Sequence, residues 1–181
     1  MRIEVIARVG VSVAALAVAL LVGFCSLVQS SPHARPAAQG EDGNLRVFAM
    51  LTSDKDYWEK WNTPPETIPR YTTPGRISPH EKTRLLILVA GLKVKDGKVD
   101  ATCWANARVV SRKVYEEGPR RPCFPNGNAS EMGDGYYMAD YSLVLASHGD
   151  TPYFMEVNVE VRDQNSGRRV QIRLSVEISE T

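Results

Sequence analysis

The sequence is poor in the residues from which metal centres and covalent active sites are built. It has three histidines, His33, His80 and His148, and no two of them stand three or four positions apart. A zinc site therefore cannot be drawn from the sequence. Gly-x-Ser-x-Gly, His-Glu-x-x-His and a phosphate-binding glycine loop are also missing. We predict a protein that is not an enzyme, with no catalytic residue, no metal and no cofactor.

An excess of charge of one sign is missing too. The 181 residues include 22 Lys and Arg against 21 Asp and Glu, for a net charge of +1. Proteins that bind nucleic acids usually carry a clustered basic excess, and here the basic clusters are doublets such as Arg120-Arg121 and Arg168-Arg169. We therefore predict no nucleic-acid partner.

The N-terminus carries an uncharged, apolar run from Val9 to Val28, preceded by Arg2 and Arg8. A positive start followed by an apolar segment is typical of an export signal, and this run is also long enough to span a bilayer as a helix. In both cases the basic end stays in the cytosol and the rest is exported. We predict a signal peptide or transmembrane anchor over residues 1–30. The protein would lie in the periplasm or cell envelope, held at the inner membrane or released after cleavage.

Cysteine is scarce, with three residues in the chain. Cys103 and Cys123 are the two in the exported part, and an oxidising compartment favours a bond between them. Such a bond would close a loop of about twenty residues and contribute roughly 3 kcal/mol. Cys25 lies in the apolar segment and is a possible lipidation site, although Phe24 is larger than the residue that a lipoprotein signal has there. The alternative is an apolar cysteine within that segment.

The clearest pattern is at the C-terminus, where two runs alternate apolar and polar residues. Residues 154–162 and 169–178 each keep this period of two, and turn-forming residues with Gly167 separate them. The pattern predicts an antiparallel hairpin whose apolar face needs a second layer. Pairing Val161 with Val170 would place Arg162 beside Arg169, whereas a slide by two residues would bring Glu160 near Arg169. The sequence leaves both registers open.

The preceding residues predict more strands. A flexible linker is expected over 31–44, because proline, alanine, glycine and polar residues mix there without a period. Strands are expected over 45–52, over 84–93 as a central strand buried on both faces, over 99–116 with a bulge or second turn near Val109, and over 136–146. Asp96-Gly97 predicts a tight hairpin turn, and the long segment 118–135 an irregular loop.

Aromatic residues gather in an arm over residues 53–80. One or two helical turns are expected from Tyr57 to Trp61, after which prolines at 64, 65, 69, 74 and 79 predict an extended chain laid over the body. The aromatic side chains would pin the arm to the sandwich or form a binding surface. The candidate binding residues are Tyr57, Trp58, Trp61, Tyr71, Phe124 and Tyr136.

Three motifs together resemble a family. Leu85–Gly91 (LLILVAG), Asp96-Gly97 and Tyr153–Gly167 (YFMEVNVEVRDQNSG) resemble the strand order and turn spacing of bacterial periplasmic immunoglobulin-like β-sandwich proteins of unassigned function. The resemblance covers about half the chain, from Glu81 to Ile178. It implies an all-β immunoglobulin-like antiparallel sandwich over residues 45–181 and assigns no catalytic residue.

We therefore predict an exported, non-enzymatic binding or assembly module, with the membrane as a partner through its N-terminal segment and a protein partner in the envelope. The alternative is a metal-handling protein or enzyme of the envelope. It would use the loop carboxylates Glu131, Asp134 and Asp140, with His148, or a copper site that gathers His148 with Met132, Met138 and Met155.

Overall fold

The structure is a computed structural model that describes residues 34–62, 70–79, 81–109, 114–125, 127, 135–141, 143–146 and 152–180. All of them belong to one compact unit, His33–Thr181. The predicted signal or anchor over residues 1–30, with Cys25, lies outside the described residues. Within the described part of the chain, no helix combines the length and apolarity needed to cross a bilayer.

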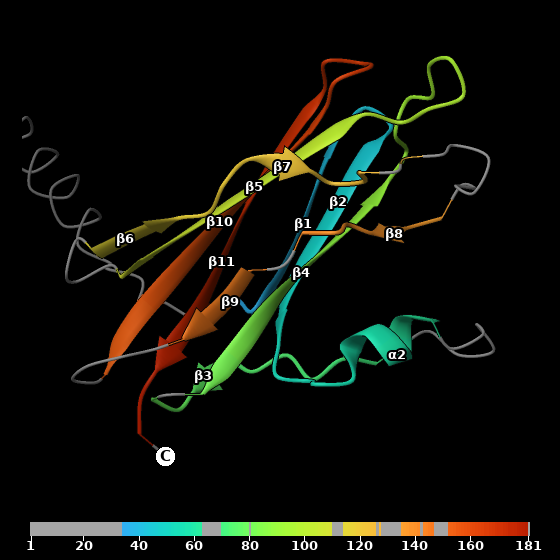
Figure 1. The fold of residues 1–181 in the computed structure, drawn as a ribbon. Coiled ribbons are helices and arrows are strands. Elements are labelled where there is room, and N and C mark those ends of the chain that lie inside the picture. Colours follow the sequence, from blue (N-terminus) through green and yellow to red (C-terminus); the bar gives the residue numbers. More distant parts are fainter. Residues whose placement is uncertain are drawn as a thin grey trace, which may run out of the picture. The chain divides into compact units, whose positions relative to one another are not determined.

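Two antiparallel sheets pack face to face (Figure 1). Sheet I orders its strands β1-β2-β4, with β8 and β9 both on the far edge of β4. These strands are β1 (Ala37–Asp42), β2 (Leu45–Thr52), β4 (Lys82–Ala90), β8 (Tyr137–Met138) and β9 (Leu143–Ala146). The prediction of an all-β sandwich is confirmed at this level.

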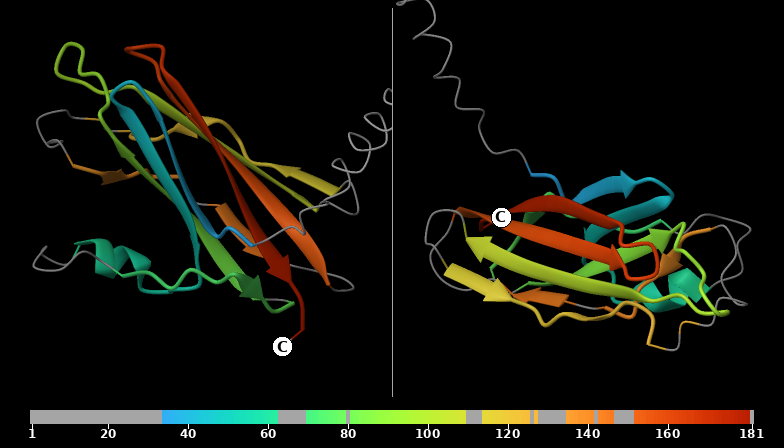
Figure 2. Two further views of the ribbon diagram at one scale, coloured as in Figure 1. Left: turned by 180° about the vertical axis from the view of Figure 1, so that it is seen from behind. Right: turned by 90° about the horizontal axis from the view of Figure 1, so that it is seen from above.

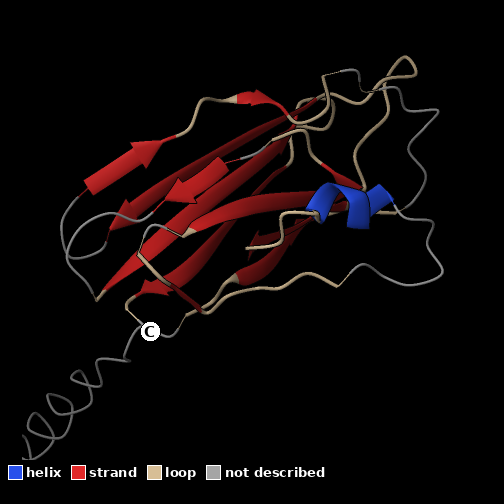
Figure 3. Ribbon diagram, turned by 60° about the horizontal axis from the view of Figure 1, so that its bottom comes forward, coloured by secondary structure: helices blue, strands red, loops and turns tan. Residues whose placement is uncertain are grey.

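Sheet II orders its strands β3-β11-β10-β5, with β6 and β7 on the outer edge of β5. Its strands are β3 (Arg76–Ile77), β5 (Ala101–Val109), β6 (Val114–Glu117), β7 (Arg121–Pro122), β10 (Tyr153–Asp163) and β11 (Arg169–Ile178). Seen from above, β5, β10 and β11 form one layer (Figure 2). The element α2 (Tyr57–Asn62) is a short helix beside the strands (Figure 3).

The C-terminal hairpin has the first of the two registers that the sequence allowed. Val161 pairs with Val170, and Arg162 pairs with Arg169 across the strands. The valines of β10 at 157, 159 and 161 are fully buried and face the inner residues of β2 and β4 across the sandwich. Each fully buried apolar side chain stabilises the fold by roughly 1.5–3 kcal/mol. The alternation read from the sequence therefore identifies this face of the core correctly.

The hairpin turn is held by a buried carboxylate. Asp163 accepts hydrogen bonds from the backbone amides of Lys93 and Asn165, both at 3.0 Å, and from the hydroxyl of Ser166 at 2.5 Å. Lys93 belongs to the β4–β5 connection, whose tip is the predicted Asp96-Gly97 turn with positive φ at both residues. Asp163 thus ties two turns at the same end of the sandwich together, and this confirms that residues 163–167 form a turn.

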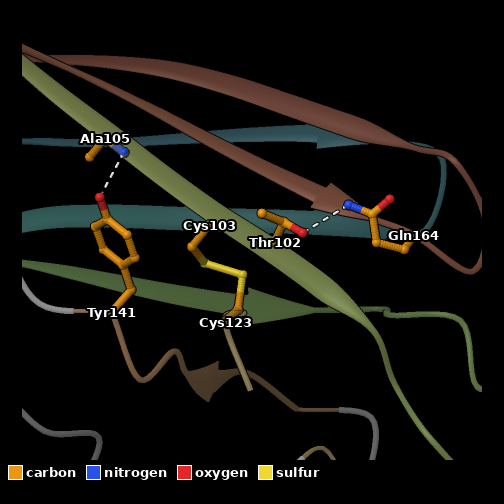
Figure 4. The surroundings of a disulfide bond; sticks show 6 residues. All are labelled: Thr102, Cys103, Ala105, Cys123, Tyr141 and Gln164. Carbon is orange, nitrogen blue, oxygen red and sulfur yellow. Dashed lines mark hydrogen bonds between the residues drawn. A yellow bond between two sulfur atoms is a disulfide. The ribbon is translucent and has the colours of Figure 1, made fainter. Parts of the chain in front are cut away.

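The expected disulfide joins Cys103 of β5 to Cys123, and both cysteines are fully buried (Figure 4). Two backbone hydrogen bonds hold Cys123 as well. Its amide donates to the Ala101 carbonyl at 2.7 Å, and its carbonyl accepts from the Asp140 amide at 2.8 Å. The first bond reaches sheet II, and the second reaches the stretch between β8 and β9 of sheet I. This segment therefore closes one open side of the sandwich.

The predicted linker over 31–44 is wrong from Arg35 onward. Ala37–Asp42 form β1, which pairs with β2 along its whole length, and Arg35 exchanges two backbone hydrogen bonds of 2.8 Å with Ser175 of β11. A Cβ on Gly40 would lie 2.8 Å from Ile172 of β11, so the missing side chain lets β1 approach sheet II closely. Composition suggested a tether because β1 has few apolar residues, but its role is to cover a sheet edge.

One other prediction needs correction. The strand expected over 136–146 is broken into two, because β8 ends at Met138 opposite Leu88 of β4 and β9 begins at Leu143 opposite Leu85. Between them, the Tyr141 hydroxyl reaches across the interior, where it accepts a hydrogen bond from the Ala105 amide at 3.0 Å (Figure 4). The arm, expected as an extended chain, contributes β3, which pairs in parallel with β11.

A charged residue at the centre of the core tests the prediction of which face of β10 is buried. Val159→Lys places an ammonium between the sheets, where burying an unpaired charge costs several kcal/mol or more, close to the whole stability of a typical domain. We expect the cooperative thermal transition in circular dichroism to disappear. Val144→Lys is the matched control, because Val144 lies on β9 with 47% of its surface exposed, and it should melt like the wild type. An unchanged melting temperature for Val159→Lys would show that the assignment is wrong.

The disulfide should make a measurable contribution to the free energy of unfolding. The closed loop spans a sequence separation of 20, so Cys103→Ala with Cys123→Ala should lower the free energy of unfolding in urea by about 3 kcal/mol. Peptide mapping without reductant should recover the two cysteines in one linked fragment. Free thiols at both positions in protein purified without reductant would refute the bond.

Candidate functional site

The outer face of sheet I is apolar, although it points away from the main core. It carries Met50 of β2 and Leu86 and Leu88 of β4, which are buried, together with the partly buried Phe48 and Met138. Successive side chains of a strand point to opposite faces. The central strand β4 is therefore apolar on both faces, as the sequence predicted, and its outer face needs a cover of its own.

The arm supplies part of this cover. Tyr57 and Trp61 of α2, and Tyr71 of the following chain, pack against the outer face. Burial raises the pKa of Tyr71, so its hydroxyl stays protonated and donates to the Tyr57 carbonyl at 3.3 Å. The Arg84 guanidinium of β4 lies 4.6 Å from the centre of the Tyr57 ring, which adds a cation–π contact between sheet and helix.

A second set of bonds fixes the arm to itself. The Asp54 carboxylate accepts from Lys60 Nζ at 2.8 Å and from the Thr72 amide at 2.9 Å, so it joins the helix to the chain beyond it. Burial alone would raise the pKa of Asp54, but the hydrogen bonds from Lys60 and Thr72 outweigh it and hold that pKa below its usual value. Asp54 is therefore charged at neutral pH and keeps both ends of the arm together.

Between arm and sheet an aromatic cleft of about 430 Å³ remains open. Its floor is the sheet, with Phe48, Met50 and Leu88, and its walls are Trp61, Tyr71 and Tyr136. Gln39 and Thr73 add two uncharged polar side chains, and none of the described residues that line it is charged. Binding sites for small molecules have this character, with volumes of roughly 300–1,000 Å³ and mostly apolar or aromatic walls.

Three of the six aromatic residues predicted to bind come together here. Trp61, Tyr71 and Tyr136 line the cleft. Tyr57 packs against the outer face of sheet I without lining the cleft, and Trp58 points outward with 53% of its surface exposed. Phe124, next to the disulfide, packs on the main core instead and does not belong to this site. Nothing in the spacing of the sequence distinguishes Phe124 from the others, because its neighbour Cys123 determines where it lies.

The floor residues were not predicted as site residues, although a signal for them exists. Residues 45–52 are apolar at almost every position, so Phe48 and Met50 stand on the parity opposite to Val47 and Ala49. A strand with two apolar faces needs a partner on each. The sequence analysis noted only weak alternation there, and it did not conclude that a second surface had to be covered.

The chain matches no protein-family model, and no curated protein is similar to it. Among solved structures, the crystal structure of a Niemann-Pick type C2 protein from Japanese carpenter ant aligns with 81% of this chain and 95% of its own. The identity is 11% and the TM-score 0.37. A similarity this low carries no argument about the function of this chain.

The structure describes only some of the residues of the alternative function. Glu131, Met132, Asp134 and His148 lie outside the described residues. Met155 is in the main core, whereas Met138 is on the outer face of sheet I. These two methionines therefore do not come together as the predicted copper site requires. Among the described residues, no group of three or more histidine, cysteine, aspartate or glutamate side chains is placed to hold a metal ion.

The outer face of sheet II has the opposite character, because its polar side chains bond one another. Glu160, with 6% of its side chain exposed, accepts from Arg120 at 2.7 Å and from Gln171 at 2.8 Å. Asn158 donates to Asn106 at 2.9 Å and accepts from Arg173 at 3.2 Å. The polar side chains named here satisfy one another, whereas the outer face of sheet I carries an apolar cluster.

Acid should weaken this polar face. Burial alone would raise the pKa of Glu160, but hydrogen bonds from Arg120 and Gln171, with the charges of Arg120 and Arg169, lower it below its usual value. A lowered folded-state pKa means that ionised Glu160 stabilises the fold above the unfolded pKa of about 4.3, and that this contribution disappears as the pH falls through the folded value.

We therefore expect the stability of the wild type to exceed that of Glu160→Gln at neutral pH, and the difference to shrink below about pH 4. Urea denaturation at a series of pH values measures it. Glu180→Gln, which removes an exposed carboxylate, is the control and should track the wild type throughout. A difference between wild type and Glu160→Gln that is independent of pH would contradict this account of Glu160.

Proposed function

We propose that the protein is a non-enzymatic binding module of the cell envelope and that it binds an apolar ligand in the aromatic cleft. Export would depend on residues 1–30, which either remain as an inner-membrane anchor or are removed. The observation that carries the proposal is the cleft itself, in which a sheet floor and three aromatic walls enclose about 430 Å³ without a charged side chain.

Energetics support a ligand at this place. Apolar surface left in water is unfavourable by roughly 25 cal/mol per Å². The rings of Trp61 and Tyr71 are held in position by the Asp54 bonds and by the Tyr71 hydroxyl, so a ligand would not have to order them. Preorganised sites keep more of the contact energy as affinity, because less is lost in fixing side chains.

Among the described residues, no carboxylate, imidazole, amine or thiol lines the cleft, and this supports a binding role over catalysis. General acid–base and nucleophilic mechanisms need a carboxylate, imidazole, amine or thiol at the reacting atoms. Among the residues that line the cleft, tyrosine hydroxyls are the only titratable groups, and burial raises the pKa of Tyr71. A protein partner in the envelope stays a prediction of the sequence, since no contact of the described residues assigns it a surface.

We also propose that the sandwich is of the immunoglobulin type. The order β2-β4-β9 in one sheet and β5-β10-β11 in the other corresponds to A-B-E and C-F-G of that fold. The disulfide departs from the antibody pattern, because it joins β5 to the segment after β7 rather than one sheet to the other. The resemblance therefore lies in topology and not in the characteristic cysteine pair.

Binding of an uncharged apolar dye tests the function. N-phenyl-1-naphthylamine should bind the full chain, reconstituted in nanodiscs, in a saturable manner and with one site, after subtraction of the signal from empty nanodiscs. Trp61→Ala removes one wall and should weaken binding by about tenfold or more, as truncation of a central aromatic contact does.

Trp58→Ala is the matched control, because it removes a tryptophan from the same helix that is 53% exposed and does not line the cleft. It should bind the dye like the wild type. Circular dichroism melts establish that both variants are folded. Equal affinities for Trp61→Ala and Trp58→Ala, or no saturable binding by the wild type, would refute the cleft as the site.

A further inference from the structure

One arginine stands at the end of the cleft formed by Tyr136. Arg46 of β2 is exposed, and its guanidinium lies 5.6 Å from the centre of the Tyr136 ring. It occupies the outer face of sheet I two residues before Phe48 of the cleft floor. Arg46 is thus a cation beside a cavity whose own lining is uncharged.

Within the described part of the chain, no carboxylate forms an ion pair with Arg46. Glu41 is its cross-strand neighbour on β1, yet the two side chains are not within ion-pair distance. Two described acids of the arm, Asp54 and Asp56, both pair with Lys60, at 2.8 and 3.2 Å. As far as the described residues show, the positive charge of Arg46 is therefore available to an anion.

There is room for a headgroup beside this cation. Arg46 lines a second cavity, of about 500 Å³, at the end of sheet I where the β1–β2 turn meets the end of β4. Asn44 and Tyr137 are the other side chains there with hydrogen-bonding groups. The Arg46–Tyr136 contact therefore connects an apolar cleft, lined by Tyr136, to a more polar cavity, lined by Arg46.

We propose that the ligand is a single-chain amphiphile with one anionic headgroup, a carboxylate or a phosphate. This inference rests on the proposed function of the cleft. The chain lies on the floor of Phe48, Met50 and Leu88, and the headgroup accepts hydrogen bonds from Arg46 at the Tyr136 end. At roughly 30 Å³ for each water-sized group, 430 Å³ holds a chain of about fourteen non-hydrogen atoms.

The uncharged lining of the cleft favours an apolar chain, and Arg46 favours an anionic headgroup. A charge within the cleft would be desolvated without a partner, which costs several kcal/mol. A charge at the Arg46 end would instead gain a charge-assisted hydrogen bond, the stronger kind. The two regions together favour an anion at one end only.

Three probes with the same chain and different headgroups test the inference. Decanoate, decanol and decyltrimethylammonium are titrated as competitors of the bound dye on the full chain in nanodiscs, with empty nanodiscs used to correct for partition. Decanoate should bind about three- to tenfold more tightly than decanol, as expected for one partly exposed charge-assisted contact. Decyltrimethylammonium should bind more weakly than decanol.

Variants separate the headgroup from the chain. Arg46→Gln should remove the preference for decanoate and leave the affinity for decanol unchanged, whereas Arg46→Lys should keep part of the preference. Glu41→Gln, which removes the nearest acid on β1, should strengthen decanoate binding and leave decanol unaffected. Trp61→Ala should weaken all three probes by a similar factor.

The outcomes distinguish the two proposals. Equal binding of decanoate and decanol, or an unchanged preference in Arg46→Gln, would overturn the anionic amphiphile while the cleft remains a binding site. Dye binding without displacement by any probe would likewise overturn the amphiphile alone. No saturable dye binding at all would overturn the function of the cleft, and the amphiphile with it.

Discussion

The burial of β4 on both of its faces is the constraint on which the rest of this structure depends. Leu85, Ile87 and Val89 point into the sandwich, and Leu86 and Leu88 point out of it, yet all are buried. The inner set is covered by sheet II, whose valines on β10 are fully buried. The outer set requires a second cover, which among the described residues comes from α2 and the residues around Tyr71. The cleft is the part of the outer face that this partial cover leaves open.

The two outer faces of the sandwich differ in character, one polar and one apolar. On sheet II, Glu160, Asn158 and their partners satisfy one another across neighbouring strands, so this face needs nothing further. On sheet I, apolar floor and aromatic walls offer contacts that no described residue takes up. The edges are closed separately, by β1 and Arg35 on one side and by Cys123 on the other, which leaves the faces free to differ.

Much of the fold followed from the sequence wherever one pattern decided between structures. The period of two in β10 and β11, the Asp96-Gly97 turn and the Cys103–Cys123 bond each depend on local chemistry or on a simple count, and the structure contains all three. The prediction of a linker over β1 was wrong because β1 has few apolar residues to signal its pairing with β2. The prediction of one unbroken strand over 136–146 was wrong because the break is held by a distant partner, the Ile87 carbonyl, which accepts from the Ala139 amide and is not visible from the neighbouring sequence. In the site, Trp61, Tyr71 and Tyr136 were recognised as candidates, whereas Phe48 and Leu88, which form the floor beneath them, were not.

The central claim is that the arm lies on the outer face of sheet I and frames the cleft there. Nuclear Overhauser effects between the Trp61 indole and the methyl groups of Met50 and Leu88, in methyl-labelled protein, test it most directly. The structure predicts contacts from Trp61 to these floor residues, whereas the exposed Trp58 should show none to them. Contacts of neither tryptophan with Met50 or Leu88 would place the arm elsewhere and contradict the cleft.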